Sequence, residues 1–413
     1  MTSAGERNVA AAAATPVADR TSERWLTAGV GGIGSASLLA DLGHEVPTSL
    51  LPSFLTSTLR APAAALGVIE GIADGLAGIA RLGGGALADD PGRRRSVAVG
   101  GYASTAVLSG LIGAAANVWQ VGVLRAGAWT ARGIRGPARN ALLADVVAPA
   151  AYGRAYGFER AMDNLGAIGG PLIALGLVGL IGVRTAILLS IIPGLLATLA
   201  ILFAIRHAPA LTQRERQPIR LQVRPLLHGQ LGRLLLAIGA FEFGNLAATL
   251  LILRATDLLN PGRSHQSAVQ LALVLYTAYN VAATITSIPA GHASDRFGNT
   301  RVLAAGAGLF AIAFLGLALS GESFALLGAC FIAAGVAIGC AETAENAAVA
   351  HLAPEGVRGS AFGLQAALQS IGNLAASAIA GALWTLVSPA AAFIYVAAWM
   401  VCAFGVLTAT PAR

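Results

Sequence analysis

Long apolar segments recur along this chain, and their spacing predicts a bundle of membrane helices. They lie at roughly 26–55, 62–88, 95–115, 118–147, 154–180, 183–205, 231–255, 267–293, 301–320, 323–350, 359–384 and 388–409. A helix needs roughly 20 mostly apolar residues to cross a bilayer, and these segments approach or exceed that length. We therefore expect an all-α membrane protein with about twelve membrane-spanning helices.

One long polar interruption separates the first six apolar segments from the last six. It covers about 207–230 and contains four arginines and three prolines. We expect four parts: a disordered cytoplasmic tail at 1–24, a six-helix bundle at 25–206, a basic cytoplasmic linker at 207–230 and a second six-helix bundle at 231–410. The basic linker also suits contact with anionic lipid headgroups.

The composition supports a membrane protein and excludes most other classes. Only 11% of the residues are charged, against about 25% in soluble domains. The net charge of +7 comes from arginine alone, because the chain contains no lysine. Arginines in loops are an orientation signal in membrane proteins, so we do not expect nucleic-acid binding. Nucleotide-binding and nucleophile motifs are absent, so we expect no enzyme activity and no cofactor.

The distribution of arginine predicts the orientation in the membrane. Seventeen arginines lie in the loops and tails or at the segment ends on the side that carries both ends of the chain and the linker. The opposite side has three, namely Arg60, Arg184 and Arg263. Positively charged loops stay in the cytoplasm. We expect a multi-pass protein of the cytoplasmic (inner) membrane with both termini in the cytoplasm.

Two blocks of sequence repeat at one offset of 206 residues. The block that runs from Gly85 to Arg95 matches the block from Gly291 to Arg301. The same offset places Gly133, Asn140, Gly153, Gly157 and Gly166 on Gly339, Asn346, Gly359, Gly363 and Gly372. Parallel repeats in a transporter imply two similar bundles around a central path.

The repeated block resembles the signature loop of the major facilitator superfamily, whose pattern is G-x-x-x-D-x-x-G-R-[RK]. The residues that carry the resemblance are Gly85, Asp89, Gly92, Arg93 and Arg94 in the first copy and Gly291, Asp295, Arg296, Gly298 and Arg301 in the second. The resemblance implies a major facilitator fold, with two pseudo-symmetric six-helix bundles around a central cavity. It also implies transport of a small solute by alternating access, with both loops as gating motifs.

A second sequence element indicates the direction of transport. Gly166, Gly170 and Pro171 form a G-x-x-x-G-P pattern in the fifth segment, which resembles an element of exporters and antiporters in this superfamily. The usual following pair of glycines is absent. Proton antiporters of the superfamily often carry an arginine in the fourth segment, where this chain has Trp129. The first feature favours an exporter, and the second weakens the expectation of proton coupling.

Ionisable residues inside membrane segments are costly, so they often mark function. In the first segment Asp41, His44 and Glu45 share one helix face at spacings of three and four. The cluster suits a proton or substrate site, a structural hydrogen-bonding group, or a metal site. The sequence leaves these three alternatives open, although we expect no resident metal.

Further polar residues inside the segments are candidates for the proton and substrate sites. They are Glu70, Asp74, Arg125, Arg132, Asp163, Glu242, Asn245, Gln365 and Gln369. Opposite charges in the second, fourth and fifth segments predict buried pairs between those helices. Gln365, Gln369 and Asn373 are spaced by four, so they form a polar stripe that faces a cavity or a partner helix.

The sequence thus predicts a monomeric, proton-coupled exporter of a drug or metabolite, whose partners are a small solute, protons and the lipid bilayer. The energy must come from an ion gradient or from the gradient of the solute. The first alternative is a proton-coupled uptake symporter for a small metabolite. A metal-ion or chelate exporter and a non-transporting membrane sensor are further alternatives.

Overall fold

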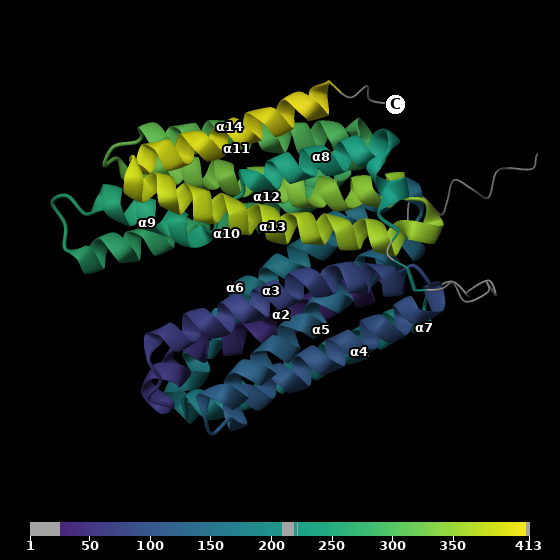
Figure 1. Ribbon diagram of the computed structural model, residues 1–413, viewed down its shortest axis with the longest axis horizontal. Helices are drawn as coiled ribbons and strands as arrows, with labels where there is room; N and C mark the ends of the chain where they lie inside the picture. The colour runs from purple at the N-terminus through teal and green to yellow at the C-terminus, as the bar shows by residue number, and fades with distance from the viewer. Residues whose placement is uncertain (1–24, 209–218, 221, 410–413) are drawn as a thin grey trace, which may run out of the picture.

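The structure is a computed structural model that describes residues 25–208, 219–220 and 222–409, and no strand occurs in these ranges (Figure 1). The predicted tail and most of the predicted linker lie outside the described residues. The first half contains α2 (Ala28–Ser53), α3 (Ala63–Ala88), α4 (Pro91–Leu111), α5 (Val118–Asp145), α6 (Tyr152–Leu189) and α7 (Ile191–Arg206). The second half contains α8 (Gly229–Phe243), α9 (Ala248–Leu259), α10 (His265–Phe297), α11 (Asn299–Leu319), α12 (Phe324–Leu352), α13 (Arg358–Leu386) and α14 (Pro389–Thr408).

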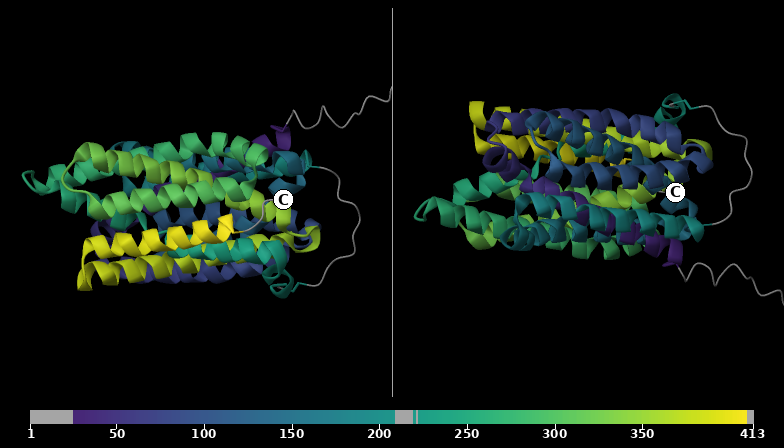
Figure 2. Two further views of the ribbon diagram at one scale, coloured as in Figure 1. Left: turned by 90° about the horizontal axis from the view of Figure 1, so that it is seen from above. Right: turned by 90° about the horizontal axis from the view of Figure 1, so that it is seen from below.

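The helices form two bundles that lie side by side, with α2–α7 in the N-terminal bundle and α8–α14 in the C-terminal bundle (Figures 1 and 2). Within the described ranges, eight helical segments are long and apolar enough to cross a membrane. Helices α2, α3 and α5 are not among them although they have 26, 26 and 28 residues. These three helices carry most of the charged candidates of the first half. Twelve membrane crossings therefore remain a prediction.

Two of the predicted segments differ in detail from the helices. The seventh segment is broken between α8 and α9, at Gly244. A side chain there would meet the carbonyl oxygen of Val396 at 2.8 Å, so α14 packs directly on the backbone at the break. The fifth and sixth segments meet inside α6 at Gly182, whose φ of 77° favours glycine. The chain therefore turns within α6, a few residues before α7 begins.

The bundles touch most closely along two pairs of helices, α3 with α13 and α6 with α10. A Cβ atom on Gly85 would lie 2.7 Å from the carbonyl oxygen of Gly359. In the other pair, a Cβ atom on Gly153 would collide with the backbone of Gly291. Only glycine permits such an approach of two helix backbones. These contacts lie at the end of the molecule that carries Asp89 and Asp295, which we call the motif end.

The bundles separate towards the opposite end. Contact between α3 and α13 extends from Gly85 to Gly78, which faces Ser370. Earlier on α3, a Cβ atom on Gly75 or Gly71 would meet nothing within 4 Å. The structure is therefore closed between the bundles at the motif end.

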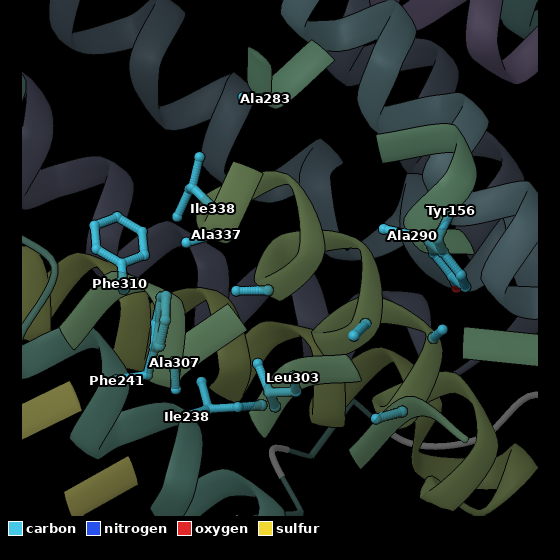
Figure 3. Close-up of a cluster of buried hydrophobic side chains, with 14 of the residues drawn as sticks. Tyr156, Ile238, Phe241, Ala283, Ala290, Leu303, Ala307, Phe310, Ala337 and Ile338 are labelled. Atoms are coloured by element: carbon cyan, nitrogen blue, oxygen red, sulfur yellow. The ribbon is translucent and has the colours of Figure 1, made fainter. Parts of the chain in front are cut away.

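The C-terminal bundle contains a large apolar core. Phe241 of α8 packs edge-on against Phe310 of α11, with ring centroids 5.7 Å apart. Ile338 of α12 lies near this pair, and Tyr156 of the N-terminal bundle lies beside Ala290 of α10 (Figure 3). Glycines of α12 let α10 and α12 approach closely, since a Cβ atom on Gly339 would lie 2.6 Å from the carbonyl oxygen of Ala283.

Candidate functional site

The first copy of the signature loop, predicted to be a gating motif, joins the two bundles through Asp89. This residue follows the last turn of α3, and its carboxylate accepts hydrogen bonds from the backbone N–H of Ser360, at 2.8 Å, and from the Ser360 hydroxyl. Ser360 lies in the first turn of α13, where the helix dipole favours a negative charge. Burial raises the pKa of the Asp89 carboxyl, and the hydrogen bonds from Ser360 oppose that rise.

The second motif makes the reciprocal contact. The Asp295 carboxylate accepts hydrogen bonds from the backbone N–H groups of Gly153, at 2.7 Å, and Arg154, at 3.1 Å. The Arg154 side chain adds an ion pair, with Nε 2.8 Å from Oδ2. Gly153 and Arg154 lie in the first turn of α6. Each motif carboxylate therefore binds the start of a helix in the opposite bundle.

The repeat offset relates these two contacts. Ser360 stands 206 residues after Arg154, as Asp295 stands 206 residues after Asp89. Sequence reasoning chose the two aspartates but missed Arg154 and Ser360 as their partners, although the offset contained that signal. The other motif residues lie around these turns. Gly92 donates to the Asp90 cap of α4, Arg93 is half-buried, Arg296 lies over the Phe297 ring, Gly298 precedes α11 and Arg301 is exposed.

The first-segment cluster forms on α2 as its spacing predicts. Nδ1 of His44 lies 3.2 Å from the Asp41 carboxylate, and Nε2 lies 3.2 Å from the Glu45 carboxylate. Nδ1 also lies 3.1 Å from the carbonyl oxygen of Ala40, its hydrogen-bond partner, so the two carboxylates are within ion-pair distance of the ring without hydrogen-bond geometry, and only an imidazolium cation would pair with both. Arg132 of α5 approaches Asp41 at 3.7 Å. The cluster can therefore hold a proton between two acids, next to a fixed positive charge.

The charged candidates of α3 pair with α5. Glu70 forms an ion pair with Arg125 at 2.9 Å, and Arg125 also donates to the Thr48 hydroxyl on α2. One turn on, Trp129 donates from Nε1 to Asp74 at 2.8 Å. The Trp129 ring stands edge-on to the His44 ring. The residue in the usual arginine position thus connects the α3 acids with the α2 cluster.

Asp163 lies between two guanidinium groups. Arg139 of α5 approaches one carboxylate oxygen at 3.3 Å, and Arg160 of α6 approaches the other at 2.8 Å. Arg139 also pairs with Glu159 at 2.8 Å. The predicted buried pairing among the second, fourth and fifth segments is therefore confirmed by these contacts and by the pair of Glu70 with Arg125.

Arg160 extends this network across the interface between the bundles. It forms an ion pair with Glu342 of α12. Near it, Asn140 of α5 donates to Asn346 of α12 at 3.3 Å. Arg81 of α3 donates to the carbonyl oxygen of Ala366 on α13 at 2.9 Å. Because these contacts connect α3, α5 and α6 with α12 and α13, the centre of the interface is polar on both sides.

The exporter-type glycines pack against the α2 cluster. A Cβ atom on Gly166 would lie 2.7 Å from the Cβ atom of Asp41, and one on Gly170 would collide with the Cβ atom of Glu45. The backbone of α6 therefore lies directly on the acidic face of α2. Any shift of α6 along α2 must move this cluster, because neither glycine leaves free space.

The candidates of the C-terminal bundle lie together but apart from the α2 cluster. Asn245, at the break between α8 and α9, donates to Glu242 at 3.0 Å. On α13, Gln365 donates to Asn346 at 3.2 Å and Gln369 donates to Glu345 at 3.1 Å. Two members of the predicted polar stripe of α13 thus face a partner helix, α12, and the third, Asn373, donates to the carbonyl oxygen of Asn245 at 2.8 Å. Within the described residues, no group of three His, Cys, Asp or Glu side chains has a geometry that could hold a metal ion.

Comparison with known proteins agrees with this architecture. The family model of the Major Facilitator Superfamily matches residues 33–257 and 257–412. An uncharacterized MFS-type transporter of Methanocaldococcus jannaschii is 28% identical over 377 residues, which cover 90% of this chain and 92% of that protein. The human organic anion transporter MFSD10 (TETRAN) has a similar structure, with a TM-score of 0.75 and 17% identity. The match covers 92% of this chain and 99% of that chain. A bacterial homologue of the iron transporter ferroportin in its outward-facing state has a TM-score of 0.72 and 17% identity. The match covers 92% of this chain and 98% of that chain.

Two bundles of membrane helices, joined at a polar interface and at the two signature loops, define a secondary transporter fold. The chain belongs to the major facilitator superfamily. It is a multi-pass membrane protein whose family moves small solutes, often with protons. The family and fold are those of transporters and not of enzymes.

Proposed function

We propose that the protein is a proton-coupled exporter of a small polar solute. The observation that carries this proposal is the position of Asp163, between Arg139 and Arg160. Arg160 is at the same time paired with Glu342 across the interface. When the bundles move apart there, the ion pair between Arg160 and Glu342 breaks, and the Arg160 guanidinium then pairs with Asp163 alone. A proton on Asp163 weakens the hold on Arg160 and favours its pairing with Glu342.

The α2 cluster is the second part of the proposed proton path. Asp41 and Glu45 flank His44, and Arg132 stands beside Asp41. Because Gly166 and Gly170 seat α6 on this face, Asp163 and the cluster belong to two helices that move as one unit. Protonation on α2 therefore changes the charge next to the helix that carries Arg160.

The solute is proposed to bind at the polar centre of the interface, near Arg160 and Glu342. Residues of both charges and amides such as Gln369 line the two sides. Under the proposed orientation, with both termini in the cytoplasm, the closed motif end is the cytoplasmic end, and this closure supports assignment to an outward-facing state. Release of an exported solute and capture of a proton from outside take place in this state.

The test has two steps. A thermal-shift screen of the purified protein against candidate drugs and metabolites identifies a solute, because a ligand that binds the folded state stabilises it. That solute is then offered to proteoliposomes under imposed proton gradients. Antiport predicts uptake into liposomes with an acidic interior. A rate of solute uptake that is the same with an inward, an outward or no proton gradient would refute proton coupling.

The same experiment decides between export and the uptake symporter. Trp129 in place of the usual antiporter arginine is the observation that favours symport, because its hydrogen bond to Asp74 supplies no positive charge to a relay. A symporter accumulates solute when the exterior is acidic and the interior is not. That outcome would replace the exporter proposal.

A further inference from the structure

A cavity of about 410 Å³ opens at the motif end, away from the central interface. The turn between α10 and α11, the start of α8 and the end of α12 form its walls, and Pro149 and Ala150 of the N-terminal bundle complete it. Arg233, Arg301 and His351 line it. Asp295 also reaches the cavity, but its carboxylate already binds Arg154. The cavity therefore carries an excess of positive charge.

The N-terminal bundle shows what is missing at this place. There Arg94, which is only 2% exposed, fills the equivalent space. It forms an ion pair with Asp145 and donates from Nε to the carbonyl oxygen of Ala88 at 2.7 Å. The offset of 206 residues puts Thr300 at the position of Arg94 and His351 at the position of Asp145. Thr300 and His351 thus stand in place of an ion pair whose arginine is buried, which leaves the space open.

The two repeats also differ in how the next helix begins. Asp90 caps α4, and its carboxylate accepts hydrogen bonds from the backbone N–H groups of Gly92, at 2.9 Å, and Arg93, at 3.0 Å. Helix α11 begins after Gly298 with no side-chain cap, and Arg296 stands at the sequence position of Asp90. The first turn of α11 lines the cavity. Uncapped N–H groups at a helix start attract an anion.

An independent feature marks the same cavity as a ligand site. Ser294 lines it and is 2% exposed, yet its Oγ has no hydrogen-bond partner among the described residues. Oδ1 of Asn299, in the first turn of α11, is likewise buried without a partner there. Buried polar atoms are nearly always hydrogen-bonded. A bound ligand with its own oxygen atoms would satisfy the Ser294 hydroxyl.

We propose that this cavity binds a phosphate group, either free in solution or in a lipid headgroup. Arg233 and Arg301 supply charged donors, the first turn of α11 supplies backbone N–H groups, and Ser294 supplies a hydroxyl. This set of donors suits the several oxygens of a phosphate better than the two of a carboxylate. Because Pro149 and Ala150 come from the opposite bundle, occupation of the cavity stabilises the closed motif end.

The test uses the purified full-length chain and two probes. In detergent, inorganic phosphate is titrated at constant ionic strength and thermal unfolding is followed. In nanodiscs, phosphatidylcholine alone is compared with phosphatidylcholine that contains phosphatidic acid. Arg301→Gln and Arg233→Gln should each weaken the apparent affinity for the phosphate probe on the order of tenfold, since each removes a charge-assisted hydrogen bond. Arg206→Gln, at the exposed end of α7, is the matched control and should respond as the unmodified protein does.

The outcomes separate the two sources of phosphate. Saturable stabilisation by inorganic phosphate that the variants lose supports a soluble anion. Stabilisation by phosphatidic acid alone, lost in the same variants, supports a lipid headgroup. Ser294→Ala keeps both arginines, so it tests the site where an arginine variant fails to fold, and it should also weaken binding. Absence of both responses, or equal loss in Arg206→Gln, overturns the proposal.

Discussion

Asn140 donates a hydrogen bond to Asn346, its own equivalent in the second repeat, with Nδ2 and Oδ1 3.3 Å apart. A residue meets its own equivalent only near a two-fold axis, so this pair marks where the pseudo-two-fold axis passes between the bundles. The same axis relates the contact of Asp89 with Ser360 to that of Asp295 with Arg154. Both contacts lie at the motif end, so they must break when the bundles separate there.

Neutralising a motif carboxylate should weaken the closed motif end. Asp89→Asn and Asp295→Asn each lose charge-assisted hydrogen bonds, which contribute about 1.5–3 kcal/mol. We expect a roughly tenfold shift of the equilibrium towards the open motif end and slower transport by a folded protein. The distance between spin labels at Ala116 and Asn260, both at the opposite end, reports the shift. Asp90→Asn is the control, because Asp90 caps its own helix; an effect of equal size there would contradict the gating role.

A methyl group at the closest helix crossing should have a similar effect through sterics. In Gly85→Ala the added Cβ would lie 2.7 Å from the Gly359 carbonyl oxygen. Overpacking of this kind costs about 1–3 kcal/mol, and only the closed motif end carries that cost. The same spin-label pair measures the change. Gly83→Ala adds a methyl group where nothing lies within 4 Å, so a shift in that variant would disprove the steric explanation.

The α2 cluster is predicted to couple transport to protons. Asp41→Asn and Glu45→Gln should abolish gradient-driven accumulation in proteoliposomes and leave solute exchange within about twofold of normal, because exchange needs no net proton movement. Asp257→Asn, which changes an exposed acid of α9, should leave both activities unchanged. Loss of exchange in both cluster variants would indicate solute binding or a structural role instead. Retention of gradient-driven transport would exclude the cluster as the coupling site.

The arginine distribution predicts the topology. In a chain whose Cys330, Cys340 and Cys402 have been replaced, a cysteine at Arg220 should react with a membrane-impermeant reagent only after the cells are opened. A cysteine at Arg263 should react in intact cells, because positive loops stay in the cytoplasm. Labelling of the Arg220 position from outside would reverse the orientation. It would also make the closed motif end the outer end.

Much of the fold could be predicted from the sequence because the relevant signals are local. Hydropathy shows where helices run, and the offset of 206 residues shows that the halves repeat. The breaks were harder to place. Gly244 looks like any glycine in an apolar segment, and its break depends on α14, which packs on its backbone at Val396. The split inside α6 depends on the positive φ of Gly182, and composition around that residue does not reveal it.

The candidate site was predicted in its parts but not in its connections. The spacing of Asp41, His44 and Glu45 correctly predicts one helix face, because those positions belong to a single helix. The partners of Asp163 could not be predicted, since Arg139 and Arg160 are two of several arginines within reach by sequence. The sequence also does not show that Trp129 binds Asp74. Such pairings depend on helix crossing angles and on rotation about each helix axis.

The sequence alone determined that the chain resides in a lipid bilayer, that it contains two repeats with paired motifs, and which superfamily it belongs to. Hydropathy and spacing along the chain encode these properties. Only the tertiary structure decided that the motif end is closed and that Arg160 reaches Glu342 in the other bundle. It also decided that a cavity is present beside Thr300 and His351, whereas Arg94 and Asp145 occupy the equivalent space in the N-terminal bundle. These features depend on how two similar bundles pack on each other. That packing is the sum of many weak contacts between residues distant in sequence, so no local pattern records it.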